Sequence, residues 1–336
     1  MKSLIQKLVE TASPSGYESA IREVIRAEIA SFVDELSVDA LGSLIAVKGK
    51  EKTSGAKIML SAHMDEIGIM VTHIEENGFL RFVTLGGVQP ITCIGGRVRF
   101  LNGQIGVVNV ELMDDRNKLP AIENLYVDIG ASRREEVALR VGDVAAFDRP
   151  FTVLGDRLVS KAMDDRIGCA VLVETLRRLK DIPHRLYFVF STQEEVGLRG
   201  ATAAAFGVDP DIGLAIDVTG TGDTPKNKRM EVALGKGPAV KVRDGGMLAD
   251  PRVVDWMVGA AETAGLPYQL EILLGGTTDA RAIQLTRAGV PAGCLSIPCR
   301  YVHSPSEMVD YNDVENAVRL LLELLSRPVD LNGETG

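Results

Sequence analysis

Two adjacent carboxylates, Glu194 and Glu195, stand where an apolar run ends and a glycine-bearing turn begins. The apolar run, residues 186–190, is typical of a strand buried in a parallel sheet, and open α/β sheets bind ligands in the crevice beyond the carboxyl ends of such strands. Because neighbouring side chains diverge as a chain leaves a sheet, one carboxylate is able to bind a metal while the other moves protons. The alternative is a solvated pair of glutamates at the start of a helix.

Four further residues of metal-ligating type stand at comparable places in the sequence. His63 and Asp217 each end an apolar run. Asp164 begins an apolar helical stretch, and His303 follows the last apolar run. Because the carboxyl ends of parallel strands meet at one edge of a sheet, we expect these four and Glu195 to lie together. Each of the four also has an interpretation without a metal. His63 would be a hydrogen-bonded histidine at a strand end and Asp217 a turn former. Asp164 would be a helix cap and His303 a loop residue.

The composition of this set indicates which metals it would bind. Two imidazoles with three carboxylates suit Zn²⁺ or Co²⁺ and are too rich in nitrogen for a Ca²⁺ site. Five ligands supply three to each of two metals only if one carboxylate bridges. Two-metal hydrolytic sites hold their ions about 3.5–4 Å apart and clamp the attacking and the leaving group. The remaining histidines, His73 and His184, fall in a strand-rich stretch and a polar loop and are interpreted as structural or exposed.

The elements that must position these residues alternate between strand and helix. Buried strands are predicted at residues 57–62, 186–190, 212–216 and 292–297. Helical periodicity is found at residues 2–11, 18–32, 164–179, 251–264 and 311–325. Ser15 with Glu18 is a predicted capping box for the second of these helices. The alternation surrounds a block of different character and indicates a discontinuous α/β domain, residues 1–66 and 152–336.

Residues 67–151 form that different block. Strand-like alternation dominates it, and Asn77-Gly78 and Asn102-Gly103 are strong hairpin signals. Gly86-Gly87 suggests a bulge or a corner. We therefore predict an inserted all-β domain, barrel-like or sandwich-like.

The composition excludes several classes of protein. The chain has 336 residues and a formal net charge of −9, with no stripe of Lys and Arg to neutralise nucleic acid phosphates. The sequence starts directly with an amphipathic helix, and no run approaches the roughly 20 apolar residues of a membrane span. The four cysteines show no CxxC spacing and are interpreted as reduced core residues of a cytoplasmic protein.

Five segments, in this order, resemble the di-metal aminopeptidase family of the tetrahedral and glutamyl aminopeptidases, some of whose members carry the older name endoglucanase M. These segments are Ala62–Gly68, Ala162–Gly168, Gln193–Gly200, Gly276–Ala280 and Arg300–Pro305. The resemblance covers essentially the whole chain. It implies an α/β fold, a phosphorylase/peptidase-like mixed sheet sandwiched by helices, with the inserted barrel-like domain acting as a lid or in dimerisation. It also implies a homododecamer built from dimers.

The resemblance further implies a role for each candidate. One divalent ion would be bound by His63 and Asp217. A second would be bound by Glu195 and His303, and Asp164 would bridge the two.

Two more residues acquire roles from the resemblance. Glu194 would be the general base that takes a proton from the metal-bridging water and passes it to the leaving amine. Asp65 would hold the imidazole of His63 in the correct tautomer. The metals would polarise the scissile carbonyl and anchor the free α-amine. Family members often carry Thr or Val where this chain has Cys299, and a small residue where it has Arg281, so substrate preference or subunit contacts are expected to differ.

The predicted function is a cytoplasmic di-metal aminopeptidase that acts on short peptides. One alternative is a glycosidase, which the aromatic content of 5% and the single Trp disfavour because little is left for sugar stacking. Another is a metal-stabilised assembly scaffold without catalysis. The preferred N-terminal residue stays open, since Lys241, Arg243 and Arg300 favour acidic side chains only if they are not solvated. The choice between Zn²⁺ and Co²⁺ also stays open, because this ligand set accepts both ions.

Overall fold

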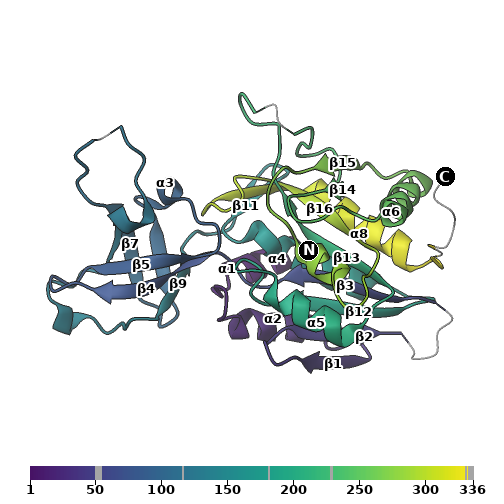
Figure 1. The fold of residues 1–336 in the computed structure, drawn as a ribbon, viewed down its shortest axis with the longest axis horizontal. Coiled ribbons are helices and arrows are strands. Elements are labelled where there is room, and N and C mark those ends of the chain that lie inside the picture. The colour runs from purple at the N-terminus through teal and green to yellow at the C-terminus, as the bar shows by residue number, and fades with distance from the viewer. Residues whose placement is uncertain (50–54, 116, 181, 228–229, 330, 332–336) are drawn as a thin grey trace.

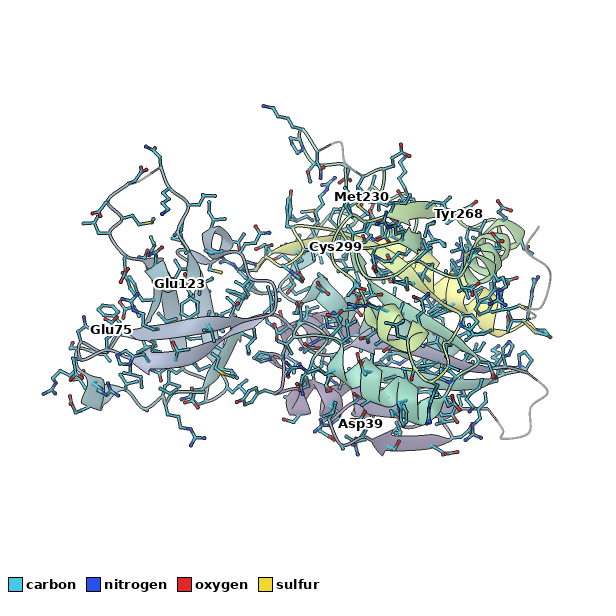
Figure 2. All side chains as sticks on the ribbon, viewed as in Figure 1. Asp39, Glu75, Glu123, Met230, Tyr268 and Cys299 are labelled. Atoms are coloured by element: carbon cyan, nitrogen blue, oxygen red, sulfur yellow. The ribbon has the colours of Figure 1, made fainter. Side chains whose placement is uncertain are left out.

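The computed structural model describes residues 1–49, 55–115, 117–180, 182–227, 230–329 and 331. It has two units, a body with a large sheet and helices and a smaller β unit that projects from one side of it (Figure 1). Side chains fill the spaces between the ribbons of both units (Figure 2).

The body is organised around a mixed sheet of 11 strands. Its main path runs in the order β1-β2-β12-β3-β13-β16-β17-β11-β10, and β14 pairs with β16 and β15 beside it. The strands on the path are, in this order, Glu35–Val38, Leu44–Lys48, Arg185–Ser191, Lys57–His63, Ile212–Thr219, Ala292–Arg300, Glu307–Asp310, Arg157–Ser160 and Thr152–Leu154. The two strands beside it are Ala239–Arg243 (β14) and Gln269–Ile272 (β15).

Helices cover both faces of this sheet. One apolar cluster joins the sheet to α1, α2, α4, α6 and α8, which span Lys2–Glu10, Ser19–Ile29, Met163–Arg178, Pro251–Ala264 and Tyr311–Leu325. A second cluster, on the other face, joins Met59 and Val189 to α5 (Arg199–Val208) and α7 (Asp279–Gln284). Ile58 and Met59 are consecutive residues of β3 and belong to different clusters, because successive side chains of a strand point to opposite faces of the sheet. The predicted sheet sandwiched by helices is confirmed.

The projecting unit is a closed barrel with the strand order β4-β5-β8-β7-β6-β9. These strands span Gly68–Ile74, Leu80–Leu85, Leu125–Asp128, Ile105–Val110, Arg97–Phe100 and Val144–Phe147, and the unit also holds α3 (Pro90–Cys93), η1 (Ile122–Asn124) and η2 (Arg134–Glu136). Gly78 and Gly103 stand in the turns between β4 and β5 and between β6 and β7, with φ of +85° and +92°. Both turns need the left-handed backbone that glycine adopts without strain. The inserted barrel-like unit is therefore confirmed.

One local prediction is wrong. Helix α2 begins after Glu18, which makes no side-chain cap, and Oγ of Ser13 accepts a hydrogen bond from the backbone amide of Ile21 at 3.3 Å. The hydroxyl of Ser15 instead donates to Oδ2 of Asp65 at 2.6 Å. Oε1 of Glu18 accepts from the backbone amides of Gly16 and Gln193 at 2.7 and 3.1 Å. The Ser15 hydroxyl thus serves a distant acceptor, because the buried carboxylate of Asp65 needs hydrogen-bond donors.

The cysteines and the helices add two observations. Cys93, Cys169, Cys294 and Cys299 are all buried with free thiols; Cys299 is labelled in Figure 2. Among the helices in the described part of the chain, none is both long and apolar enough to cross a membrane.

Candidate metal centre

Four strands at the centre of the sheet bring the candidate ligands to one edge. β12, β3, β13 and β16 are neighbours in this order and run parallel to one another. His63 is the last residue of β3, and Glu195 follows β12. Asp217 lies within β13, which is longer than the sequence predicted, and His303 follows β16. Asp164 reaches the same edge from the start of α4.

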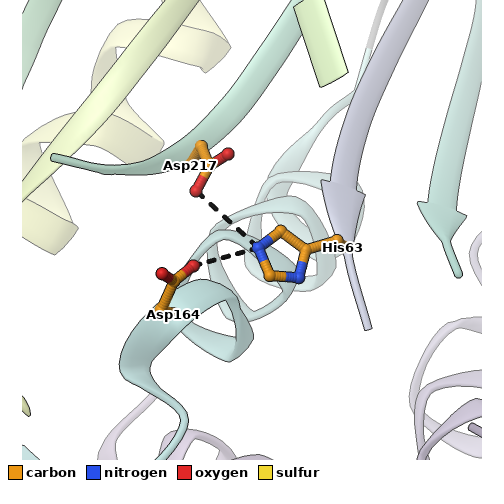
Figure 3. A group of neighbouring side chains, drawn as sticks. All are labelled: His63, Asp164 and Asp217. Carbon is orange, nitrogen blue, oxygen red and sulfur yellow. Dashed lines mark hydrogen bonds and ion pairs between the residues drawn. The ribbon is translucent and has the colours of Figure 1, made fainter. Parts of the chain in front are cut away.

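The first group of ligand-type atoms joins His63, Asp164 and Asp217. Nε2 of His63 lies 2.9 Å from Oδ1 of Asp164 and 3.9 Å from Oδ1 of Asp217 (Figure 3). One ligand-type atom from each of the three residues lies within 4.8 Å of the others. All three residues are buried, so water competes little for these atoms.

Asp164 also belongs to a second group, with Glu195 and His303. Nε2 of His303 lies 3.3 Å from Oδ2 of Asp164 and 3.3 Å from Oε2 of Glu195. The two carboxylate oxygens of Asp164 therefore face two different histidines. A carboxylate that bridges two cations requires this arrangement.

Glu194 stands beside both groups and belongs to neither. Its Oε2 lies 3.9 Å from Nε2 of His63, and its side chain is 11% exposed. The adjacent Glu195 side chain is only 3% exposed and turns toward His303. The two neighbouring glutamates thus diverge as the chain leaves β12.

Asp65 holds the backbone of this glutamate pair. Its Oδ1 and Oδ2 accept hydrogen bonds from the backbone amides of Glu194 and Glu195 at 2.9 and 3.1 Å. Nδ1 of His63 lies 3.1 Å from the backbone carbonyl oxygen of Asp65 and 3.5 Å from the carboxylate. The main chain of Asp65 is therefore the shorter contact of the imidazole, while the carboxylate positions the two glutamates.

Glu307, at the start of β17, was not singled out from the sequence. Its Oε2 accepts from the backbone amide of Asp164 and its Oε1 from that of His303, both at 2.9 Å. The residue is 1% exposed. It fixes two candidate ligands from different parts of the chain, as Asp65 does for the glutamate pair. No sequence pattern near Glu307 indicates this role, because both contacts are made by backbone amides.

Several non-glycine residues in the loops around the site have a left-handed backbone. Among them are Ala162, Gln193 and His303, with φ angles of +54°, +54° and +61°. This region is sparsely populated by residues other than glycine, and such strain is found mainly where surrounding contacts hold a functional site in place.

The pKa values of the site residues are shifted in opposite directions. Burial, reinforced by neighbouring carboxylates, raises the pKa of Asp217 and of Glu194 well above the ordinary range. Burial would also raise the pKa of Asp164, but hydrogen bonds with His303 and His63 lower it. Burial would lower the pKa of His303, and contacts with Asp164 and Glu195 raise it to about 12. Mutual repulsion makes it unfavourable for all these carboxylates to ionise together, and a nearby positive charge reduces this repulsion.

The residues fit a pair of divalent cations. Oε1 of Glu195 is buried and has no hydrogen-bond partner among the described residues, which is costly unless a cation or another donor satisfies it. Two imidazole nitrogens with carboxylate oxygens are the donor set that Zn²⁺ and Co²⁺ accept. A cation in each group would also offset the crowded negative charge.

A cavity of about 440 Å³ opens onto these groups. Its wall includes residues that the sequence did not assign as metal ligands or catalytic groups, among them Gly87 from the barrel, Lys241 and Thr277. A Cβ atom at Gly87 would lie 2.4 Å from Nδ1 of His303, so only glycine lets the barrel approach this imidazole so closely. The predicted corner at Gly86-Gly87 is thus part of the site, and its proximity to His303 arises from tertiary packing alone.

The chain matches known proteins over nearly its full length. The family model described as M42 glutamyl aminopeptidase matches residues 42–320. The chain belongs to this family. The membership supports a peptidase function and agrees with the resemblance stated from the motifs.

Two individual relatives are also named as aminopeptidases. A putative aminopeptidase of Acetivibrio thermocellus is 49% identical over 97% of this chain and 98% of its own length. A lysyl aminopeptidase of Pyrococcus furiosus is 38% identical over 97% of this chain and 98% of its own length.

Solved structures agree with the fold. The aminopeptidase APDkam598 from Desulfurococcus kamchatkensis superimposes with a TM-score of 0.93 at 42% identity, over 97% of this chain and 94% of its own. A TET1 peptidase of Pyrococcus horikoshii, described as assembling into a tetrahedron or a large octahedral shell, has a TM-score of 0.87 at 32% identity. That likeness covers 96% of this chain and 98% of the other.

Proposed function

We propose that this M42 family member is a metal-dependent aminopeptidase that removes N-terminal residues from short peptides. The observation that carries the proposal is the pair of ligand groups that share Asp164, with Glu194 beside them and outside both. The first ion would be held by His63 and Asp217. The second would be held by Glu195 and His303, with Asp164 common to the two.

Bound divalent ions would supply Lewis-acid polarisation of the scissile carbonyl and an anchor for the free α-amine. The chain's own residues do the rest. The carboxylate of Glu194 takes a proton from the attacking water and delivers it to the leaving amine. Burial is the main cause of the raised pKa of Glu194, and a raised pKa favours uptake of a proton by this carboxylate. Asp65 and Glu307 keep the backbone of Glu194 and of the ligands in place.

Assembly and location follow as further parts of the proposal. The TET1 peptidase of Pyrococcus horikoshii is described as assembling into closed shells, and this chain resembles it over nearly its whole length. We propose that the chain self-associates into a homododecamer built from dimers, with the barrel taking part in dimerisation, and that it works in the cytoplasm. Light scattering of the purified protein measures the assembly directly.

The decisive experiment is a panel of aminoacyl-nitroanilides assayed with metal-depleted protein. Hydrolysis is expected to be absent after chelation and to return when Zn²⁺ or Co²⁺ is supplied. Activity on cellulose oligomers that survives chelation would instead support a glycosidase. Hydrolysis of neither substrate class, with metal bound, would support a scaffold without catalysis.

A further inference from the structure

A second cavity adjoins the one at the candidate metal centre. It measures about 430 Å³, and Gly197, Leu198 and Arg281 belong to the walls of both cavities. Its remaining wall contains Phe206 and Arg287. The space available to a substrate therefore continues from the metal centre past Arg281 toward α5 and α7.

The charges change sign along this path. Carboxylates of Asp164, Glu194 and Asp217 line the inner cavity. Lys241 is also in its wall, but its ammonium pairs with Glu271 and is neutralised there. Among the described residues that line the inner cavity, Arg281 is the arginine or lysine with no carboxylate within ion-pair distance.

The other arginine in the wall of the second cavity, Arg287, already has a partner. The guanidinium of Arg287 lies 3.5 Å from the centre of the Phe206 ring and donates to the backbone carbonyl oxygen of Phe206. Arg281 is exposed as well, but it has no aromatic ring or carboxylate partner among the described residues, and it belongs to the walls of both cavities. It is thus the cation that a substrate would meet first on leaving the metal centre.

Gly246 fixes the course of the Arg281 side chain. A Cβ atom at Gly246 would lie 2.9 Å from Cδ of Arg281 and 2.7 Å from Oγ1 of Thr277, so both side chains pack over this glycine. The hydroxyl oxygen of Thr277 is buried and has no hydrogen-bond partner among the described residues. Thr277 also lines the inner cavity. The side chain of Arg281 and this unpartnered hydroxyl therefore pack over the same glycine, and both residues line the inner cavity.

We propose that Arg281, assisted by the hydroxyl of Thr277, binds a carboxylate of the peptide substrate. The inference rests on the proposed aminopeptidase function. A peptide whose positive α-amine enters the acidic end of the path carries its negative carboxylate away from it, toward Arg281. A planar guanidinium binds a carboxylate through two parallel hydrogen bonds, with geometric selectivity that an ammonium lacks. The carboxylate belongs either to the C-terminus of a short peptide or to an acidic N-terminal side chain.

The test compares Arg281→Gln with the wild-type holoenzyme on matched substrates. Leucyl-leucine and leucyl-leucinamide differ only in the terminal carboxylate, and glutamyl- and glutaminyl-nitroanilide differ only in the side-chain carboxylate. We expect Arg281→Gln to raise KM on the order of 10- to 100-fold for one carboxylate-bearing substrate, with kcat nearly unchanged and the neutral partner unaffected. The pair that responds identifies which carboxylate is bound.

Two further variants make the result specific. Thr277→Val removes the hydroxyl with little change of shape and is expected to raise the same KM by a smaller factor, about threefold to tenfold. Arg243→Gln removes the same charge from an exposed arginine outside both cavities. It is expected to leave the KM ratio of the charged to the neutral substrate unchanged in both substrate pairs.

The inference is overturned if Arg281→Gln changes all four substrates equally or changes none. If the wild type hydrolyses the neutral substrates and Arg281→Gln leaves both KM ratios unchanged, the carboxylate site is refuted and the proposed function is not. A metal-loaded wild-type protein that hydrolyses none of the four refutes the proposed function, and the inference with it.

Discussion

Oε2 of Glu307 accepts a hydrogen bond from the backbone amide of Asp164 at 2.9 Å, which ties the start of α4 to the start of β17. The other oxygen of Glu307 accepts from the backbone amide of His303 at the same distance. One buried carboxylate thereby sets the spacing of two candidate ligands that are far apart in the sequence. The geometry of a metal site depends on the groups that hydrogen-bond to its ligands, because these contacts orient the ligands.

Replacement of Glu307 by Gln tests this support. An amide has one acceptor oxygen, so one of the two backbone amides is left facing an NH₂ group without an acceptor. We expect metal affinity to fall on the order of 10- to 100-fold, measured by Co²⁺ titration of metal-depleted protein. Glu315→Gln, which alters a glutamate paired with Arg178 on the surface of α8, is the control and is expected to bind metal as the wild type does. Unchanged affinity in Glu307→Gln would refute the supporting role.

The adjacent glutamates are expected to respond differently to the same substitution. Glu194→Gln removes the proton acceptor, so kcat should fall by about 10²- to 10⁴-fold while two metal ions stay bound. Glu195→Gln removes a ligand, so the second ion should be lost. Metal analysis by mass spectrometry, alongside kcat on a nitroanilide, separates the two. An empty metal site in Glu194→Gln would show that Glu194 is a ligand and not the base.

Gly87→Ala probes the contact between the barrel and the site. The added Cβ would lie 2.4 Å from Nδ1 of His303, so the imidazole or the barrel loop must shift. Because a displacement of about 1 Å in a catalytic site costs on the order of 10²-fold, we expect a loss of this size in kcat/KM with an unchanged melting temperature. Gly207→Ala is the matched control, since a Cβ there meets nothing within 4 Å. Full activity in Gly87→Ala would mean that the barrel does not constrain His303.

His184 is expected to make stability depend on pH. Burial lowers the pKa of His184, although Nε2 lies 2.7 Å from the backbone carbonyl oxygen of Arg327. A histidine whose folded-state pKa is lowered contributes stability above its unfolded pKa of about 6.5, and this stability is lost as the pH falls toward the folded value. The unfolding free energy of the wild type relative to His184→Gln should therefore be larger at pH 8 than at pH 5, as measured by urea denaturation.

Local patterns in the sequence determined much of the fold. Apolar runs predicted the parallel strands that end near His63 and Glu195, and Asn-Gly pairs predicted the barrel hairpins at Gly78 and Gly103. Such features depend on residues within a few positions of one another, because strand burial and turn conformation are set by local side-chain types. The rule that parallel strands end at one edge was then enough to bring the five candidate ligands together.

Only the tertiary structure decided which atoms meet there. The strand order β12-β3-β13-β16 results from pairing between distant segments, and it places one oxygen of Asp164 at His63 and the other at His303. The predicted capping box of Ser15 does not form, because its hydroxyl donates to Asp65, which lies 50 positions further along the chain. Glu307 and Gly87 reach the site through backbone contacts and close approach, which leave no periodic pattern in a sequence. Long-range packing creates these contacts, so the sequence alone supplied the ligand types and the fold supplied their geometry.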